Sequence, residues 1–158
     1  MTPLRFAADR MLGRLATWLR LLGHDTTYGS HLSGRTLVRQ ARDEHRIMLT
    51  RDRRRLRDRP CPPLIFIESD HFRDQVRQVV AACGIEPFAH LLTRCARCNE
   101  PLLETTKEQV ADQVPPYVLA TQPRFVRCPR CQRIYWAATH VDRLHDELVT
   151  MGFQPPAR

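Results

Sequence analysis

Short apolar runs alternate with helical repeats over roughly the first 90 residues of the chain. Four apolar or β-prone stretches predict strands, at 4–7, 25–28, 47–50 and 64–67. Between and after them, apolar residues spaced by three and four predict helices at 11–22, 33–45 and 71–82. Buried strands that alternate with amphipathic helices are typical of a parallel sheet flanked by helices, so we expect an α/β fold.

The chain changes character after this region. Residues 91–136 contain four cysteines, several prolines and little helical periodicity. Apolar residues at helical spacing then return and predict a last helix over 139–151. We therefore expect two domains, an α/β domain over 1–90 and a smaller domain over 91–158, with the boundary inside 85–92.

Two cysteine pairs lie in the second region. Cys95 and Cys98 form one C-x-x-C motif, and Cys128 and Cys131 form another, with 29 residues between the two motifs. Each pair places two thiolates on one tight turn, and two such turns complete the tetrahedral sulfur site that zinc prefers. The apolar run at 134–137 is typical of the second hairpin of a zinc ribbon. Four cysteines leave no open coordination position, so we expect a structural zinc ion.

Acidic residues follow the predicted strands of the first region. Asp9 and Asp52 each lie just past a strand, and Glu68 and Asp70 lie past a third. Because the carboxyl ends of parallel strands meet at one edge, these carboxylates could share Mg²⁺ or Mn²⁺, which would orient a water for attack on a phosphodiester. Asp9 and Asp52 could instead cap the helices that follow them. Spacing alone leaves both interpretations open.

The charge balance indicates which kinds of partner the chain could bind. The chain has 25 basic and 17 acidic residues, a net charge of +8, and every cation except Lys107 is an arginine. Guanidinium groups bind phosphates and stack on bases, which favours a nucleic acid, although a GC-rich genome would give the same composition. No apolar run is long enough to span a membrane, and the charged N-terminus lacks a signal-peptide pattern. We therefore expect a cytoplasmic protein without membrane contact.

Three features of the sequence resemble one known family. They are FAADRMLGRLATWLRLLGHDT at 6–26, RIMLTRDR at 46–53, and the two cysteine pairs followed by Tyr135, Trp136 and His140. Together they are similar to the Mut-seven C-terminal RNase-like domain family, and the resemblance covers 4–151. It implies a PIN-like parallel sheet flanked by helices, followed by a small zinc ribbon and a C-terminal helix.

The resemblance also implies a metal-dependent ribonuclease that hydrolyses RNA at an acidic Mg²⁺ or Mn²⁺ site. Asp9 and Asp52 match acidic positions of the family, and Asp70 (or Glu68) is the positional candidate for a further one. Relatives often carry an aspartate at the start of the second helix, where this chain has Gly34. The acidic pair at 43–44 could substitute only if the end of that helix points inward.

The arginines beside Asp52 fit the same interpretation. Arg51, Arg53, Arg54 and Arg55 are predicted to bind RNA phosphates, with a solvated charged face as the alternative. Two other functions stay open at this point. Gly34 favours a catalytically weak or inactive RNA-binding module, and the ribbon could instead dock a protein partner or a second copy of the chain.

Overall fold

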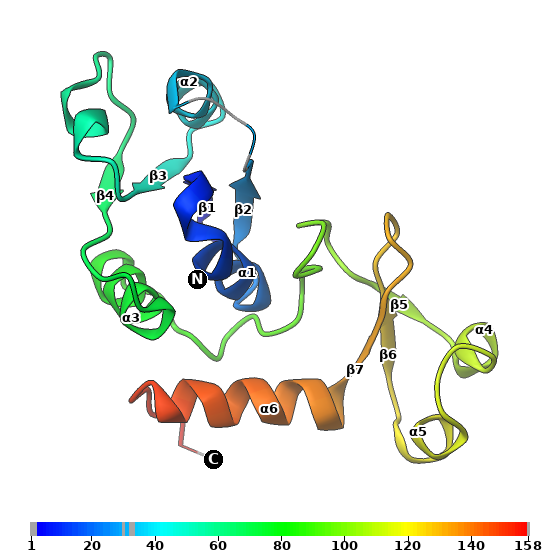
Figure 1. Ribbon diagram of the computed structural model, residues 1–158. Coiled ribbons are helices and arrows are strands. Elements are labelled where there is room, and N and C mark those ends of the chain that lie inside the picture. Colours follow the sequence, from blue (N-terminus) through cyan, green and yellow to red (C-terminus); the bar gives the residue numbers. More distant parts are fainter. Residues whose placement is uncertain (1–2, 30, 32–33, 158) are drawn as a thin grey trace.

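The computed structural model describes residues 3–29, 31 and 34–157 and contains two separate sheets (Figure 1). The larger sheet has four parallel strands in the order β2-β1-β3-β4. Their bounds are β1 Arg5–Ala8, β2 Asp25–Tyr28, β3 Ile47–Thr50 and β4 Leu64–Phe66. The predicted α/β fold with a parallel sheet is confirmed, and each strand lies within one residue of its predicted position.

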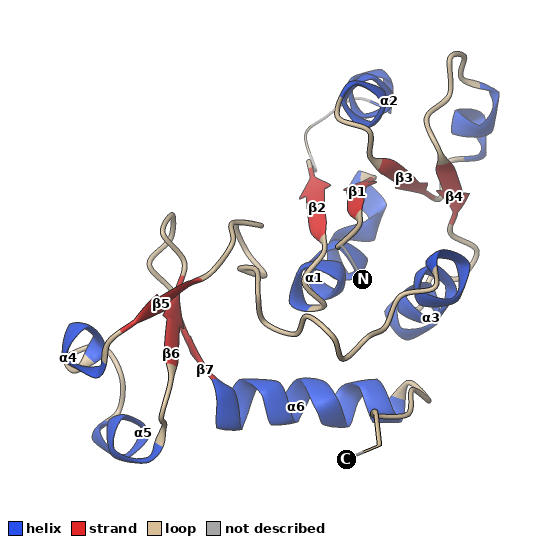
Figure 2. Ribbon diagram, turned by 180° about the vertical axis from the view of Figure 1, so that it is seen from behind, coloured by secondary structure: helices blue, strands red, loops and turns tan. Residues whose placement is uncertain are grey.

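Helices cover both faces of the larger sheet. On one face, α1 (Gly13–Leu21) and α3 (Phe72–Cys83) pack against Phe6, Ala8 and Leu49. On the other face, α2 (Gly34–Asp43) packs against Ala7 and Met48. Neighbouring residues of β1 and β3 thus face opposite layers, which explains why most residues of these two central strands are apolar. The view from behind shows the sheet between α2 and the α1–α3 pair (Figure 2).

Two short 3-10 helices lie beyond the strand ends. The first, η1 (Arg10–Leu12), precedes α1, so the predicted helix over 11–22 begins as a tighter turn. The second, η2 (Arg53–Arg57), follows β3 and contains most of the arginine run. Both begin immediately after an aspartate, which places the predicted acidic residues at helix starts as well as at strand ends.

The smaller sheet is antiparallel, with the order β5-β6-β7. Its strands are β5 Leu103–Thr105, β6 Phe125–Arg127 and β7 Ile134–Trp136. Two short helices that the sequence did not predict, α4 (Lys107–Val110) and α5 (Pro116–Thr121), connect β5 to β6. They are too short to show a helical repeat, and Thr106 with Gln109 forms a capping box at the start of α4.

The last helix, α6 (Ala137–Thr150), runs from the smaller sheet back to the larger one (Figure 1). Leu148 and Met151 belong to the same buried cluster as α1 and α3, and Arg73 of α3 pairs with Glu147 at 2.6 Å. The C-terminal end of the chain therefore packs on the core formed by its N-terminal half. Among the described residues, no helix has the length and apolar character needed to cross a bilayer.

Candidate functional site

The carboxyl ends of β1 and β3 bring two of the predicted acidic residues together. Asp9 follows β1 directly, and its amide donates a hydrogen bond to the Leu49 carbonyl at 3.0 Å. Asp52 lies two residues after the end of β3. Both aspartates line one open pocket of about 350 Å³. The edge of the sheet thus carries two adjacent carboxylates facing solvent.

Thr50, the last residue of β3, connects the two aspartates. Its Oγ1 donates a hydrogen bond to Asp9 Oδ2 at 2.8 Å and accepts one from the Asp52 amide at 3.0 Å. The Thr50 side chain is fully buried, so water does not compete for these bonds. We call Asp9, Thr50 and Asp52 the carboxylate site. The sequence pattern gives no sign of this role for Thr50, because a threonine at the end of an apolar run is a common strand residue.

Both aspartates also cap the short helices that follow them. Asp9 Oδ1 accepts from the Arg10 amide at 2.6 Å, and Asp52 Oδ1 accepts from the Arg54 amide at 3.0 Å. The capping interpretation of the sequence is therefore realised in the structure. The second oxygen of each carboxylate makes a further contact, since Asp9 Oδ2 accepts from Thr50 and Asp52 Oδ2 accepts from Arg54 and Arg55.

Arginine side chains donate further hydrogen bonds to the Asp52 carboxylate. Arg54 Nε donates to Asp52 Oδ1 at 2.9 Å, and Arg55 Nε donates to Oδ2 at 3.3 Å. The hydrogen bond from Arg54 is the largest influence on this carboxyl and lowers the pKa of Asp52 to about 2. Asp52 is consequently ionised at any physiological pH, and its charge is balanced by two guanidinium groups.

Arg55 fills the space that the resemblance assigns to an acidic side chain. A Cβ added to Gly34 would lie 2.9 Å from Arg55 Cζ, so the guanidinium packs directly on the glycine backbone. The Arg55 side chain is only 15% exposed and also donates to Asp58 at 2.9 Å. Glycine at position 34 and arginine at position 55 therefore fit one another, and a cation stands beside Asp52 instead of a further carboxylate.

The other acidic candidates lie away from the carboxylate site. The Asp70 side chain is 83% exposed, lies 3.9 Å from His71 and lines a different pocket. Glu44 pairs with Arg46 at 2.5 Å, near the amino ends of the strands, and Asp43 pairs with its neighbour on α2. Among the described residues, the structure brings together only Asp9 and Asp52 of the predicted acidic set.

The four arginines predicted to bind nucleic acid differ in how freely they project. Arg51 donates to the carbonyl of Glu68 at 2.8 Å and so ties the end of β3 to the end of β4. Arg53 lies over the ring of Phe66, 4.6 Å from its centre, and Arg54 is 82% exposed. Arg53 and Arg54 are therefore accessible to a ligand, whereas Arg51 and Arg55 mainly hold the local structure.

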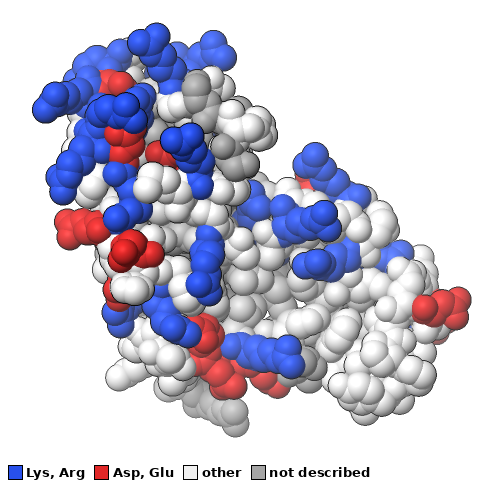
Figure 3. Space-filling view, viewed as in Figure 1, with Lys and Arg blue, Asp and Glu red and all other residues white. Residues whose placement is uncertain are grey.

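Basic side chains gather on the surface around the carboxylate site. Figure 3 shows a dense group of them over η2 and α2, and a second group over the loops at one end of the smaller sheet. Acidic side chains are interspersed at the first group, as expected from the ion pairs of Asp52 and Asp58. This face would attract a polyanion through the unpaired members of the group.

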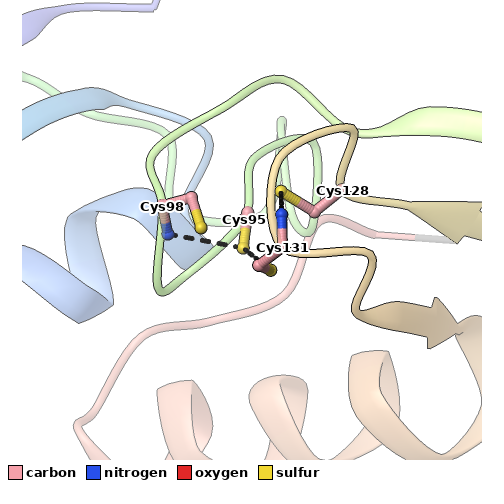
Figure 4. Close-up of side chains that lie close together, drawn as sticks. All are labelled: Cys95, Cys98, Cys128 and Cys131. Atoms are coloured by element: carbon pink, nitrogen blue, oxygen red, sulfur yellow. Dashed lines mark hydrogen bonds between the residues drawn. The ribbon is translucent and has the colours of Figure 1, made fainter.

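We call the part of the molecule around the larger sheet the larger lobe, and the part around the smaller sheet the smaller lobe. The four predicted zinc ligands form a compact cluster in the smaller lobe. Cys95 and Cys98 lie on one turn and Cys128 and Cys131 on the hairpin turn between β6 and β7 (Figure 4). Their Sγ atoms all lie within 4.8 Å of one another, and the Cys95 and Cys131 sulfurs are 3.7 Å apart. A tetrahedron with Zn–S bonds of ~2.3 Å has S···S edges of ~3.8 Å. This cysteine cluster could hold a zinc ion.

The turn that carries Cys95 and Cys98 is fastened to the larger sheet. Asn99, which has a φ of 67°, accepts a hydrogen bond from the Thr26 amide at 2.9 Å and donates one to Asp25 at 2.7 Å. Arg20 of α1 donates to the Ala96 carbonyl at 3.1 Å. The two lobes are thus joined by polar contacts at this turn as well as by α6.

Asp25 is the charged centre of that junction. Burial alone would raise its pKa, but hydrogen bonds from Arg46 and Asn99 outweigh burial and lower the pKa of Asp25 to about 2. Arg46 is itself buried and donates to Asp25 Oδ1 at 2.8 Å. Arg46 also pairs with Glu44 at 2.5 Å and Asp25 with Arg5 at 3.3 Å, so the junction is a network of ion pairs rather than a single pair.

The aromatic residues of the resemblance differ in their surroundings, and Trp136 packs on the Phe125 cluster of the smaller sheet. Tyr135 is buried, and its hydroxyl lies 3.4 Å from Cys95 Sγ. Trp136 packs against the His140 ring, with ring centres 4.6 Å apart. Trp18 is stacked on Phe72 with centres 6.2 Å apart. Tyr135 and Trp18 therefore contribute to packing, and both also line a cavity that is described below.

The structure defines a class of protein in which a parallel α/β domain is joined to a four-cysteine ribbon. The α/β domain carries the carboxylate site at the edge of its sheet, and the ribbon carries the cysteine cluster. The chain belongs to the Mut7-C RNAse domain family, whose family model matches residues 4–148. This match confirms the resemblance given by the sequence and supports a nuclease-like role. No curated protein and no solved structure matches the chain.

Proposed function

We propose that the protein is a ribonuclease that binds RNA across the carboxylate site and hydrolyses a phosphodiester there. The observation that carries this proposal is the pairing of Asp9 and Asp52 through Thr50 at the mouth of a pocket lined by arginines. The match to an RNase domain family supports the same reaction class. RNA is the substrate that the family name indicates.

The charges in the pocket suit a phosphodiester. The scissile phosphate would contact Arg54, whose exposed guanidinium is held beside Asp52, and positive charge there would stabilise the additional negative charge of the transition state. Asp9 would accept a hydrogen bond from the attacking water and orient it. Thr50 would keep Asp9 in place, because its buried hydroxyl donates to the carboxylate.

The sequence also predicts Mg²⁺ or Mn²⁺ at Asp9 and Asp52, and the residues as placed do not fit such an ion. Ions of this kind take about six oxygen ligands in near-octahedral geometry. Both oxygens of Asp52 are engaged by Arg54 and Arg55. Among the described residues, the cysteine cluster is the one group of three or more metal-ligating side chains. The catalytic metal remains a prediction, and the proposed roles rest on the side chains themselves.

A second candidate function is RNA binding without cleavage. It is favoured by Arg55, which packs against Gly34 and neutralises Asp52. In this case the arginines would hold the phosphate chain, and Asp9 with Asp52 would serve only to position them. The predictions of a protein partner or a homodimer stay open as well, and a binding affinity that falls steeply with salt favours RNA over either of them.

For the cysteine cluster, we propose a structural zinc ion held by four thiolates. A saturated sulfur tetrahedron has no open position for water or substrate, so its role is to fix the two turns and the strands that extend from them. Metal analysis of protein purified without chelator tests this directly. One zinc per chain supports the assignment, and a zinc-free folded protein contradicts it.

The ribonuclease proposal is tested by comparing wild type with Asp9→Asn, which keeps the size of the side chain and one accepting oxygen and removes the charge. The matched control is Asp112→Asn, an exposed aspartate in the other lobe. We expect Asp9→Asn to abolish cleavage of single-stranded RNA while RNA affinity stays near wild type and the protein stays folded at the temperature of the assay. Equal cleavage by wild type and Asp9→Asn would rule out the site.

Each reaction is run with Mg²⁺, with Mn²⁺ and with EDTA. A requirement for the divalent ion would overturn the roles assigned to the side chains alone and would support the predicted ion. Salt-dependent binding with no cleavage in any of the three conditions would select the second candidate function. Absence of RNA binding as well as of cleavage would remove both.

A further inference from the structure

A cavity of about 420 Å³ lies where α1, the start of α3, β7 and α6 meet. It is therefore bounded by both lobes of the molecule. Its wall includes the rings of Trp18, Phe72, Tyr135 and His140, together with apolar side chains from α1, from α6 and from the loop after α3. Its size is in the range of small-molecule sites, about 300–1,000 Å³.

Arginines add positive charge to this aromatic wall. Arg14 lies 3.8 Å above the centre of the Phe72 ring. Arg73 pairs with Glu147, so one cation of the cavity is balanced. Arg14 and Arg143 form no ion pair with a carboxylate in the part of the chain that the structure describes. The cavity therefore combines flat rings with two uncompensated cations.

The cavity is connected to the carboxylate site along the surface. A second pocket shares Arg14, Phe72 and Arg73 with the cavity. The same pocket shares Met11, which is exposed, with the pocket that contains Asp9. One extended ligand can therefore contact the carboxylate site and the cavity at the same time.

We propose that this cavity binds a base of the RNA chain whose phosphodiester lies at the carboxylate site, with Arg14 and Arg143 contacting the flanking phosphates. The inference rests on the proposed RNA-binding function. Aromatic rings accept any base by stacking, and a basic groove follows the backbone, which is the combination that the cavity offers. An apolar peptide segment would leave the two cations without counter-charges when it buried them.

The position of the base is tested by cross-linking the full wild-type protein. The probe is a short single-stranded RNA with 4-thiouridine in place of uridine, irradiated with long-wave ultraviolet light and mapped by mass spectrometry of peptides. We expect adducts at Trp18, Tyr135 or His140. Adducts confined to the segment around Asp9 and Asp52 would overturn the cavity assignment and leave the proposed function intact. Absence of both adducts and salt-dependent RNA binding would remove the proposed function too.

Variants then test the phosphate contact of Arg143 and the base stacking on Trp18 separately. Arg143→Gln should weaken RNA binding about fivefold at ~0.1 M salt, since each phosphate contact with a single strand contributes about 0.7 to the salt slope. The matched control, Lys107→Gln, removes the same charge from α4, which contributes no residue to the cavity or to the pockets that lead to the carboxylate site, and should leave affinity unchanged. Equal effects of the two substitutions would refute a specific contact.

Trp18→Leu removes the flat ring and should weaken RNA about five- to 150-fold, the range measured for one stacked base. It should not weaken an abasic sugar–phosphate chain of the same length. Trp18→Phe, which keeps a ring, should lie between wild type and Trp18→Leu. If the leucine variant does not fold, the phenylalanine variant and the wild-type cross-links decide. Unchanged RNA affinity in a folded leucine variant would overturn the proposal.

Discussion

Replacing Thr50 with valine is the most direct test of how the carboxylate site is held. Valine has nearly the same shape as threonine but lacks the hydroxyl that donates to Asp9 and accepts from the Asp52 amide. Since Thr50 is fully buried, no water would take the place of its hydroxyl between the two aspartates. The substitution therefore disconnects the two aspartates without opening a cavity.

The expected cost follows from the two hydrogen bonds. A neutral hydrogen bond contributes about 0.5–1.5 kcal/mol, and one to a charged group contributes about 1.5–3 kcal/mol. Losing both lowers the free energy of unfolding by about 2–4 kcal/mol. For a chain of this size the melting temperature then falls by about 5–15 °C. Thr50→Ser keeps the hydroxyl and loses one methyl group, for which we expect a cost of about 1 kcal/mol.

The assay measures thermal unfolding of the three proteins by circular dichroism and then RNA cleavage below their melting temperatures. The Thr50→Val variant should cleave RNA more slowly than wild type, on the order of 100-fold, because its Asp9 is held less firmly and small misplacements of a reacting group are costly. The serine variant should stay near wild type in both measurements. Valine and serine variants of equal stability and activity would refute the inference that this hydroxyl organises the site.

Three further outcomes are expected. Asn99→Gly keeps the left-handed backbone but loses the hydrogen bonds to Thr26 and Asp25. It should lower the free energy of unfolding, measured in urea, by about 2–4 kcal/mol without changing the zinc content. A change below about 0.5 kcal/mol would contradict the role of that junction. Zinc chelation should reduce amide protection in α1 and β2 as well as in the smaller sheet, whereas loss confined to the smaller sheet would show that the lobes are uncoupled. The pKa of Asp52 is about 2 against an ordinary 3.8, so this carboxylate contributes stability that is present above pH ~4 and is lost as the pH falls through 2. Arg54→Gln should move the titration of the Asp52 carboxyl, followed by NMR, towards 3.8. An unchanged titration would show that Arg54 is not the cause of the low pKa.

The sequence predicted the larger sheet well because its central strands, β1 and β3, are buried on both faces. The run at 47–50 coincides with β3, since a short run of apolar and β-branched residues is typical of a strand covered by helices on both sides. The sequence did not predict α4 and α5, which are shorter than the repeat that reveals a helix. Capping residues such as Thr106 were the local signal that could have located α4.

The carboxylate site was predicted in part, for a reason that also explains what was missed. Parallel strands place their carboxyl ends at one edge, so Asp9 and Asp52 converge in the structure as the topology requires. Asp70 is too far beyond β4 for that rule, and the chain has turned towards α3 by then. The contact of Arg55 with Gly34 joins positions 21 residues apart through the fold, and a single sequence carries no sign of it.

The cysteine cluster and the proposed RNA surface are structurally linked through Tyr135. Its hydroxyl lies 3.4 Å from Cys95 Sγ, while the same side chain lines the cavity between the lobes. The opposite wall comes from α1, whose Arg20 donates to the Ala96 carbonyl on the turn between Cys95 and Cys98. A metal that fixes this turn therefore also fixes the distance between the two cavity walls. A structural zinc site would then influence RNA affinity without contacting RNA, and its loss should weaken base stacking more than phosphate binding.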